Sequence, residues 1–302
     1  MEPRAREFVK CSTLPRMHGL AGPLHRGSEN RDVTKSKYGQ HNSVPFPAVR
    51  QKQVANRSAL GQQGRNNVSQ LQSRIFSDAA TGLDLPYRLF VPPDCTPDRP
   101  CGLLLFLHGA GERGTDNQAQ LKNDALAWTA QRAQAGYPTV VVYPQCPIDR
   151  QWVEAPWTDG SYSVAKTPIS QPMAAVMQLL DALQNEFPID AKRLLVTGPS
   201  MGGYGAFDII ARNPELFAGA LPLCGGGDPS QAPALRTLPI WIFHGDSDPA
   251  VPVRGSRQMV RALRDAGGSP QYTEVASGGH NMWNVAYQDL KVLRWLLAQK
   301  RE

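Results

Sequence analysis

Hydrophobic and polar positions follow two different patterns in this 302-residue chain, and the change falls near residue 73. Residues 1–72 are rich in Arg, Gln, Asn, Ser and Gly and keep no helical or strand period. Such a segment cannot bury enough apolar surface to offset the entropy that it would lose on ordering. The pattern therefore predicts a disordered N-terminal segment at 1–72 and a folded domain at 73–302.

Within 73–302, short apolar runs alternate with stretches of helical period. Gly102–Leu107 is almost continuously apolar, which is typical of a strand buried on both faces. Further strands are expected at Arg74–Phe76, Tyr87–Val91, Thr139–Tyr143, Arg193–Thr197, Ala218–Leu223, Ile240–His244 and Tyr272–Ala276, and helices at 118–135, Ile169–Phe187, Met201–Arg212, Ser256–Ala266 and Trp283–Gln299. This alternation predicts an α/β fold with a mostly parallel central sheet and helices on both faces. Functional groups are then expected at the carboxyl ends of the strands.

The net charge of +6 belongs to the N-terminal segment and not to the folded domain. Residues 1–72 carry twelve Lys and Arg against four Asp and Glu, whereas the remainder carries 20 against 22. The basic segment is interpreted either as a solvated tail or as an arm that touches an anionic surface. No basic cluster follows residue 72, so no nucleic-acid partner is expected. The longest apolar runs are far shorter than a membrane span requires, so none is expected.

Cysteine usage points to no metal site. The five cysteines form no C-x-x-C pair, and no Cys/His cluster has the spacing of a zinc site; they are Cys11, Cys95, Cys101, Cys146 and Cys224. We expect no metal and no cofactor, and thiols that are reduced or form one optional disulfide. Residues 1–30 lack the apolar core of a secretory signal, so the chain as written is expected in the cytoplasm, or exported if its natural start differs.

The segment after the strand Arg193–Thr197 carries the strongest chemical signal. Residues 198–202 read G-P-S-M-G, a G-x-S-x-G motif between a predicted strand and a predicted helix. In that context the serine sits in a sharp, strained turn that only small neighbours permit, and the next helix directs amides toward it. Ser200 is therefore the predicted nucleophile. The alternative is a glycine-rich turn with a helix-capping serine.

The glycine-rich loop HGAGERG at 108–114, after Gly102–Leu107, predicts an oxyanion hole. The expected donors are the amides of Ala110 and Met201. His108 is interpreted as a residue that orders the loop by hydrogen bonding. A phosphate-binding turn is disfavoured because the motif G-x-x-x-x-G-K-[ST] is absent.

Two later loops supply an acid and a base. Asp248 is predicted to accept a hydrogen bond from the base, while its neighbour Asp246 braces the loop and His244 is structural. His280, in a glycine-flanked loop before the last helix, is the predicted general base, and a solvent-exposed loop histidine is the alternative. The order Ser200, Asp248, His280 is the order found in α/β-hydrolases.

Six segments of the chain resemble bacterial esterases of the carboxylesterase/phospholipase and dienelactone-hydrolase type, a group often labelled predicted peptidase or prolyl-oligopeptidase-like. They are HGAGERGTDN (108–117), PQCP (144–147), GPSMGGYGAFD (198–208), LCGGGDP (223–229), HGDSDPAVP (244–252) and GGHNMW (278–283). The chain is also similar to feruloyl esterases and polyhydroxybutyrate depolymerases. The resemblance covers about 73–300 and implies an α/β-hydrolase fold with Ser200, Asp248 and His280 as its catalytic triad. Residues 1–72 have no counterpart in it.

The expected reaction is two-step hydrolysis of short-chain or aryl, feruloyl-like esters through an acyl-enzyme, on small molecules or polymer ends. Trp157 and Trp283 are expected either to form an aromatic wall for a phenolic group or sugar ring, or only to pack their own segments. Trp152 is interpreted as packing. The rival functions are a serine peptidase of the prolyl-oligopeptidase-like type and a non-catalytic relative that acts as a binding protein. The sequence does not indicate which oligomeric state the protein adopts.

Overall fold

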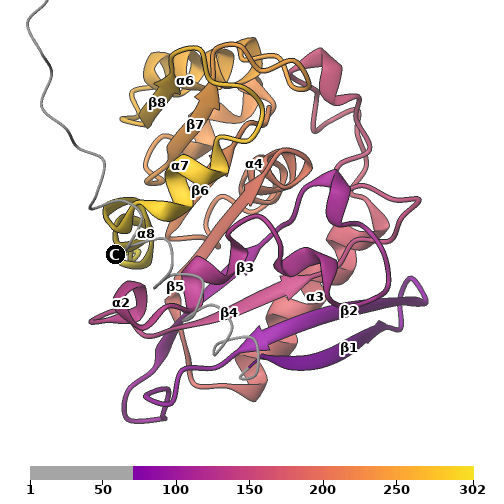
Figure 1. Ribbon diagram of the computed structural model, residues 1–302, viewed down its shortest axis with the longest axis vertical. Helices are drawn as coiled ribbons and strands as arrows, with labels where there is room; N and C mark the ends of the chain where they lie inside the picture. Colours follow the sequence, from indigo (N-terminus) through magenta and orange to yellow (C-terminus); the bar gives the residue numbers. More distant parts are fainter. Residues whose placement is uncertain (1–70) are drawn as a thin grey trace, which may run out of the picture. The chain divides into compact units, whose positions relative to one another are not determined.

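The computed structural model describes residues 71–302, in which one eight-stranded sheet carries helices on both faces (Figure 1). The strands are β1 (Gln72–Asp78), β2 (Leu83–Phe90), β3 (Cys101–Phe106), β4 (Thr139–Pro144), β5 (Ile189–Pro199), β6 (Gly219–Leu223), β7 (Trp241–Gly245) and β8 (Gln271–Val275). The helices are α2 (Gln131–Gln134), α3 (Gln171–Glu186), α4 (Met201–Arg212), α5 (Ala232–Leu235), α6 (Arg254–Asp265), α7 (Trp283–Gln288) and α8 (Leu290–Leu297).

The strand order is β1-β2-β4-β3-β5-β6-β7-β8. The six strands from β3 to β8 run parallel, and β1 and β2 complete the sheet as antiparallel strands at one edge. The predicted mostly parallel sheet is therefore confirmed. Because β5, β6 and β7 are neighbours, the loops after these three strands meet at one place on the carboxyl edge.

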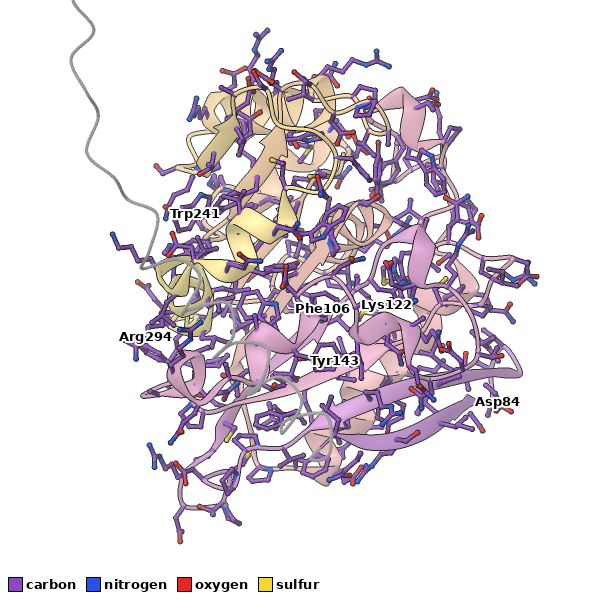
Figure 2. The ribbon with its side chains drawn as sticks, in the orientation of Figure 1. Asp84, Phe106, Lys122, Tyr143, Trp241 and Arg294 are labelled. Carbon is purple, nitrogen blue, oxygen red and sulfur yellow. The ribbon has the colours of Figure 1, made fainter. Side chains whose placement is uncertain are left out.

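Alternate residues of the central strands point to opposite faces and build two separate cores. Leu103 and Leu105 of β3 pack with α3, α4, α5 and α6, whereas Leu104 and Phe106 pack with α2, α7 and α8. Phe106 and Tyr143, from the neighbouring strands β3 and β4, lie together in the second core, with ring centroids 5.4 Å apart (Figure 2). Burial on both faces explains why these strands are apolar runs rather than alternating ones.

Two of the predicted helices are wrong as continuous helices. The stretch 118–135 holds Asn123 and Asp124 with φ of 56° and 60°, in the left-handed region that Asn and Asp tolerate best among non-glycine residues. It is therefore divided into two short 3₁₀ turns and α2. The closing helix is interrupted at Asp289, whose side chain accepts a hydrogen bond from the Lys291 amide and so begins α8 as a new helix.

In the part of the chain that the structure describes, no helix has both the length and the apolar character needed to cross a membrane. The four cysteines of that part are free thiols. The described part begins at Leu71, so the predicted disorder of residues 1–70, and Cys11 among them, lies outside it, whereas Gln72, the last residue of the predicted segment, begins β1.

Candidate active site

Ser200 lies in a strained turn between the last residue of β5 and the first residue of α4, with φ 58° and ψ −119°. Its amide donates a hydrogen bond to the Leu223 carbonyl at 2.8 Å. A Cβ atom on Gly198 would lie 2.4 Å from the Leu107 carbonyl oxygen, and one on Gly202 would lie only 1.8 Å from the same oxygen. The glycines of the G-x-S-x-G motif are therefore required by close backbone packing, which holds Ser200 in a conformation that few residues adopt.

Three side chains from separate loops form one continuous chain of hydrogen bonds. The Oγ atom of Ser200 is 2.8 Å from Nε2 of His280, and Nδ1 of His280 is 2.7 Å from Oδ2 of Asp248. A carboxylate can only accept, so Nδ1 carries a hydrogen atom and Nε2 accepts the hydrogen bond from the serine hydroxyl. The His280 side chain is 26% exposed, whereas that of Asp248 is 0% exposed. Solvent thus reaches the imidazole but not the acid behind it.

Asp248 is surrounded by hydrogen-bond donors. Its Oδ1 atom accepts from the amides of Ala250 and Val251 at 2.8 and 2.9 Å, and its Oδ2 atom lies 3.3 Å from Nε2 of His244 as well as against His280. Burial by itself would raise the pKa of this carboxyl. The hydrogen bonds from the two histidines and the two amides outweigh it and hold the pKa well below its usual range, so Asp248 is ionised at neutral pH.

The contact between His244 and Asp248 was missed by the sequence interpretation of His244 as structural. The ring is fully buried, with Nδ1 2.7 Å from Oγ of Ser256 and Nε2 3.0 Å from the Val251 carbonyl. Both neighbours of Nε2 are acceptors, so Nε2 carries a hydrogen atom and points it at the acid. The exposed Asp246 is not part of this group, and its carboxylate accepts from the Ser247 hydroxyl instead.

The loop after β3 approaches Ser200 closely. A Cβ atom on Gly109 would lie 3.7 Å from Cβ of Ser200. Ala110 begins the 3₁₀ turn Ala110–Glu112, and Met201 begins α4, so both amides belong to helix starts. Within residues 71–302, neither amide donates a hydrogen bond to the protein. Both are therefore free to bind an oxygen placed beside Ser200.

His108 holds this loop in place. Its Nδ1 atom is 2.6 Å from the Gly109 carbonyl, and its Nε2 atom accepts a hydrogen bond from the Cys146 amide at 2.9 Å. Burial lowers the pKa of His108 to about 4, so the ring is neutral and can accept at Nε2. Trp152 is also fully buried, and its Nε1 atom donates to the His108 carbonyl. The predicted roles of His108 in loop order and of Trp152 in packing agree with these contacts.

The two other predicted tryptophans lie in different surroundings. The Trp283 ring meets the His280 ring edge to face, with centroids 5.4 Å apart, and so lies beside the hydrogen-bonded chain. Trp157 packs against the core on the α3–α6 face, and its carbonyl accepts a hydrogen bond from the Tyr204 hydroxyl on α4. Of these two tryptophans, Trp283 is the one in ring contact with His280.

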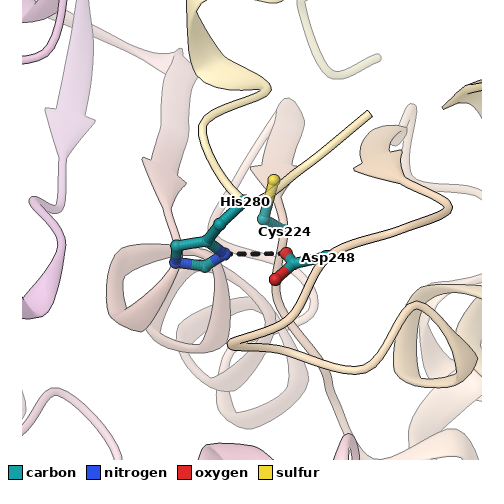
Figure 3. A group of neighbouring side chains, drawn as sticks. All are labelled: Cys224, Asp248 and His280. Atoms are coloured by element: carbon teal, nitrogen blue, oxygen red, sulfur yellow. Dashed lines mark hydrogen bonds and ion pairs between the residues drawn. The ribbon is translucent and has the colours of Figure 1, made fainter. Parts of the chain in front are cut away.

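Cys224, which sequence reasoning did not select, lies beside the acid and the imidazole (Figure 3). Its Sγ atom, a ring nitrogen of His280 and a carboxylate oxygen of Asp248 all lie within 4.8 Å of one another. These are ligand atoms of the types that hold a thiophilic metal ion. The available signal was the segment LCGGGDP, but its place beside the acid depends on the order of β5, β6 and β7, which the sequence does not show.

Residues 94–293 match the family model described as phospholipase/carboxylesterase. The chain is 24% identical over 196 residues to a bifunctional acetylxylan esterase/xylanase of Neocallimastix patriciarum, which covers 65% of this chain and 26% of that protein. A solved thermostable esterase is 40% identical with a TM-score of 0.72, over 78% of this chain and 64% of that one. A ferulic acid esterase has the same fold, with a TM-score of 0.57 at 16% identity over 75% of this chain and 98% of that one. The chain thus spans about a quarter of the curated relative and just under two thirds of the thermostable esterase.

Proposed function

This chain belongs to the phospholipase/carboxylesterase family, and we propose that it hydrolyses carboxylic esters with Ser200 as nucleophile, His280 as general base and Asp248 as the orienting acid. The observation that carries the proposal is the unbroken chain of hydrogen bonds, 2.8 Å from Ser200 to His280 and 2.7 Å from His280 to Asp248. The membership of a family of serine hydrolases of the carboxylesterase type supports it.

In the first step, Nε2 of His280 takes the hydroxyl proton while Oγ of Ser200 attacks the ester carbonyl. The amides of Ala110 and Met201 bind the oxyanion, and one such donor contributes about 3–4 kcal/mol. His280 then gives the proton to the leaving alcohol, and the acyl group remains on Ser200. Asp248 stays ionised throughout and stabilises the imidazolium.

In the second step, His280 removes a proton from water, which attacks the acyl-enzyme and releases the carboxylic acid. The substrates that we propose are short-chain or aryl esters, because the Trp283 ring beside His280 offers an apolar face for a flat acyl group. Two of the similar proteins are named for esters of these kinds: the acetylxylan esterase for a short-chain ester and the ferulic acid esterase for an aryl ester.

The test compares wild type with Ser200→Ala on p-nitrophenyl esters from acetate to octanoate and on the matching p-nitroanilides. The wild type is expected to hydrolyse the short esters and to leave the anilides almost untouched, and the variant is expected to lose roughly a thousandfold or more in kcat. Ser269→Ala, at an exposed serine between α6 and β8, is the matched control and should retain full activity. A folded wild type without esterase activity, or an active Ser200→Ala variant, would reject the proposal.

A further inference from the structure

Cys224 occupies the strand end between the ends that carry Ser200 and Asp248. It follows β6, whose last residue pairs with Pro199 of β5 and with Phe243 of β7. The Cys224 amide donates to the Phe243 carbonyl at 2.8 Å, and its φ of 47° lies in the left-handed region that cysteine rarely adopts. The backbone is therefore fixed so that the side chain stands beside the acid and the base.

The thiol takes no part in ester hydrolysis as described above, yet it lies beside the base, His280, and the acid that orients it, Asp248. The Cys224 and Asp248 side chains are fully buried, while His280 opens to solvent on one side. Burial raises the pKa of Cys224 to about 12, so the sulfur is protonated at neutral pH and does not compete with Ser200 as a nucleophile.

We propose that Cys224, His280 and Asp248 form an inhibitory binding site for a thiophilic divalent cation such as Zn²⁺ or Cd²⁺. Thiolate sulfur, imidazole nitrogen and carboxylate oxygen are three ligands that such ions accept, and water completes a tetrahedron from the exposed side of His280. Metal–ligand bonds of about 2.0–2.3 Å place neighbouring ligand atoms roughly 3.3–3.7 Å apart, so the longer separations, of up to 4.8 Å, need to close by about 1 Å. The 2.7 Å between Nδ1 of His280 and Oδ2 of Asp248 must open by roughly 0.6 Å.

Binding of the cation releases one proton to solvent and moves a second proton from one ring nitrogen of His280 to the other. The cation replaces the proton of Sγ, which is released to solvent, and it takes the place of the hydrogen atom on Nδ1 of His280. That hydrogen moves to Nε2, and Asp248 exchanges its hydrogen bond for a bond to the cation. No group is oxidised or reduced, and the three ligands with a divalent cation are neutral together.

Inhibition follows because Nε2 then carries a hydrogen atom and can no longer accept the proton of Ser200. This consequence rests on the proposed function of His280, whereas binding of the cation does not. The base is blocked and the substrate surface is not, so kcat should fall while KM stays nearly constant. Mg²⁺ and Ca²⁺ prefer oxygen ligands and should have little effect.

The test uses the chelator-treated full chain and p-nitrophenyl acetate. Zn²⁺ and Cd²⁺ are expected to lower kcat at least about tenfold, and EDTA should restore it. Cys224→Ala should still hydrolyse the ester and need roughly tenfold or more of either cation for the same inhibition, since one ligand is lost. Cys224→Gly, which suits the positive φ, is the second variant if alanine impairs folding. Cys95→Ser, which changes the thiol at the Pro188 carbonyl before the start of β5, should keep the wild-type sensitivity.

Binding is measured separately by equilibrium dialysis of Cd²⁺ against Ser200→Ala and against the same protein carrying Cys224→Ala. The first protein should bind one more equivalent than the second, because all other cysteines and histidines are common to both. Equal binding by the two proteins, or unchanged sensitivity of Cys224→Ala and Cys224→Gly, would overturn the proposal. A wild type that binds the extra equivalent but hydrolyses no ester would instead reject the proposed function.

Discussion

Asp248 is the residue on which most contacts of the site converge, and His244 supplies a donor from its buried side. Replacing His244 with Phe, which has no donor, removes the Nε2 contact at 3.3 Å. A hydrogen bond to a charged group contributes about 1.5–3 kcal/mol, so kcat/KM is expected to fall roughly tenfold or more. Loss of a donor leaves more negative charge on the Asp248 carboxylate beside the protonated imidazole, which stabilises that charged form, so the acid limb of the pH–rate profile should move to higher pH.

His108→Phe is the matched control for this prediction, because His108 is equally buried but contacts the loop before Ala110 and not the acid. It should lower the rate without moving the acid limb. A His244→Phe variant whose rate falls by the same factor at every pH would show that His244 has only a packing role.

Trp283 is the aromatic residue in contact with His280, so it is expected to select flat acyl groups. Trp283→Ala should lower kcat/KM for methyl ferulate about tenfold, and much less for methyl butyrate, because an aromatic pair contributes about 0.5–1.5 kcal/mol beyond its buried area. Trp157→Ala removes a ring that is not in ring contact with His280 and serves as the comparison. Equal losses for both esters in Trp283→Ala would contradict a role in selecting the acyl group.

At the scale of elements, the turn from β5 to α4 depends on the absence of a side chain at Gly202. Gly202→Ala would place a Cβ atom 1.8 Å from the Leu107 carbonyl oxygen. Only a movement of the backbone on one side or the other could relieve this clash. The variant is expected to lose about 3 kcal/mol or more of unfolding free energy, or not to fold. Gly111→Ala, where a Cβ atom meets nothing within 4 Å, should stay within about 1 kcal/mol in urea unfolding. Equal stability of the two variants would show that the turn can relax.

The parallel strands were predictable because burial on both faces produces apolar runs such as Gly102–Leu107. The stretch 118–135 was not, since Asn123 and Asp124 form turns through their left-handed backbone and leave the apolar spacing of a helix unchanged. Ser200, Asp248 and His280 could be selected from their loops. The contacts of Asp248 with His244 and Cys224 could not, because they depend on how the loop after β7, which carries the acid, turns back onto β7 and the end of β6.

At the scale of the whole molecule, stability should depend on pH through carboxylates in distant parts of the fold. Hydrogen bonds from Ala119, Gln118 and Gln145 lower the pKa of Asp116 to about 2, and those from Arg257 and Tyr272 lower the pKa of Glu274 to about 2. A pKa that is lower in the folded state stabilises above the unfolded-state value, and this stabilisation is lost as pH falls through the folded-state value. The urea concentration at the unfolding midpoint should therefore decrease as the pH is lowered from about 4.5 to 2.

The double variant Asp116→Asn, Glu274→Gln tests this prediction on the full chain. It should unfold about 2–4 °C below wild type at pH 7, and the difference should shrink to a small remainder as the pH falls to about 2, where the wild-type carboxylates are becoming protonated. Burial raises the pKa of Glu112 and Asp124, which act in the opposite direction, so the comparison of the two proteins is more informative than the wild-type slope. A difference that is constant from pH 7 to pH 2 would contradict the assignment.

Ser200 is proposed to form the covalent acyl-enzyme, and a covalent probe identifies the residue that reacts. The full chain is treated with a fluorophosphonate, digested and mapped by mass spectrometry. We expect one adduct per chain on the peptide that contains Ser200, none in Ser200→Ala, and strongly slowed labelling in His280→Ala. An adduct on a different serine, or undiminished labelling of Ser200→Ala, would contradict it.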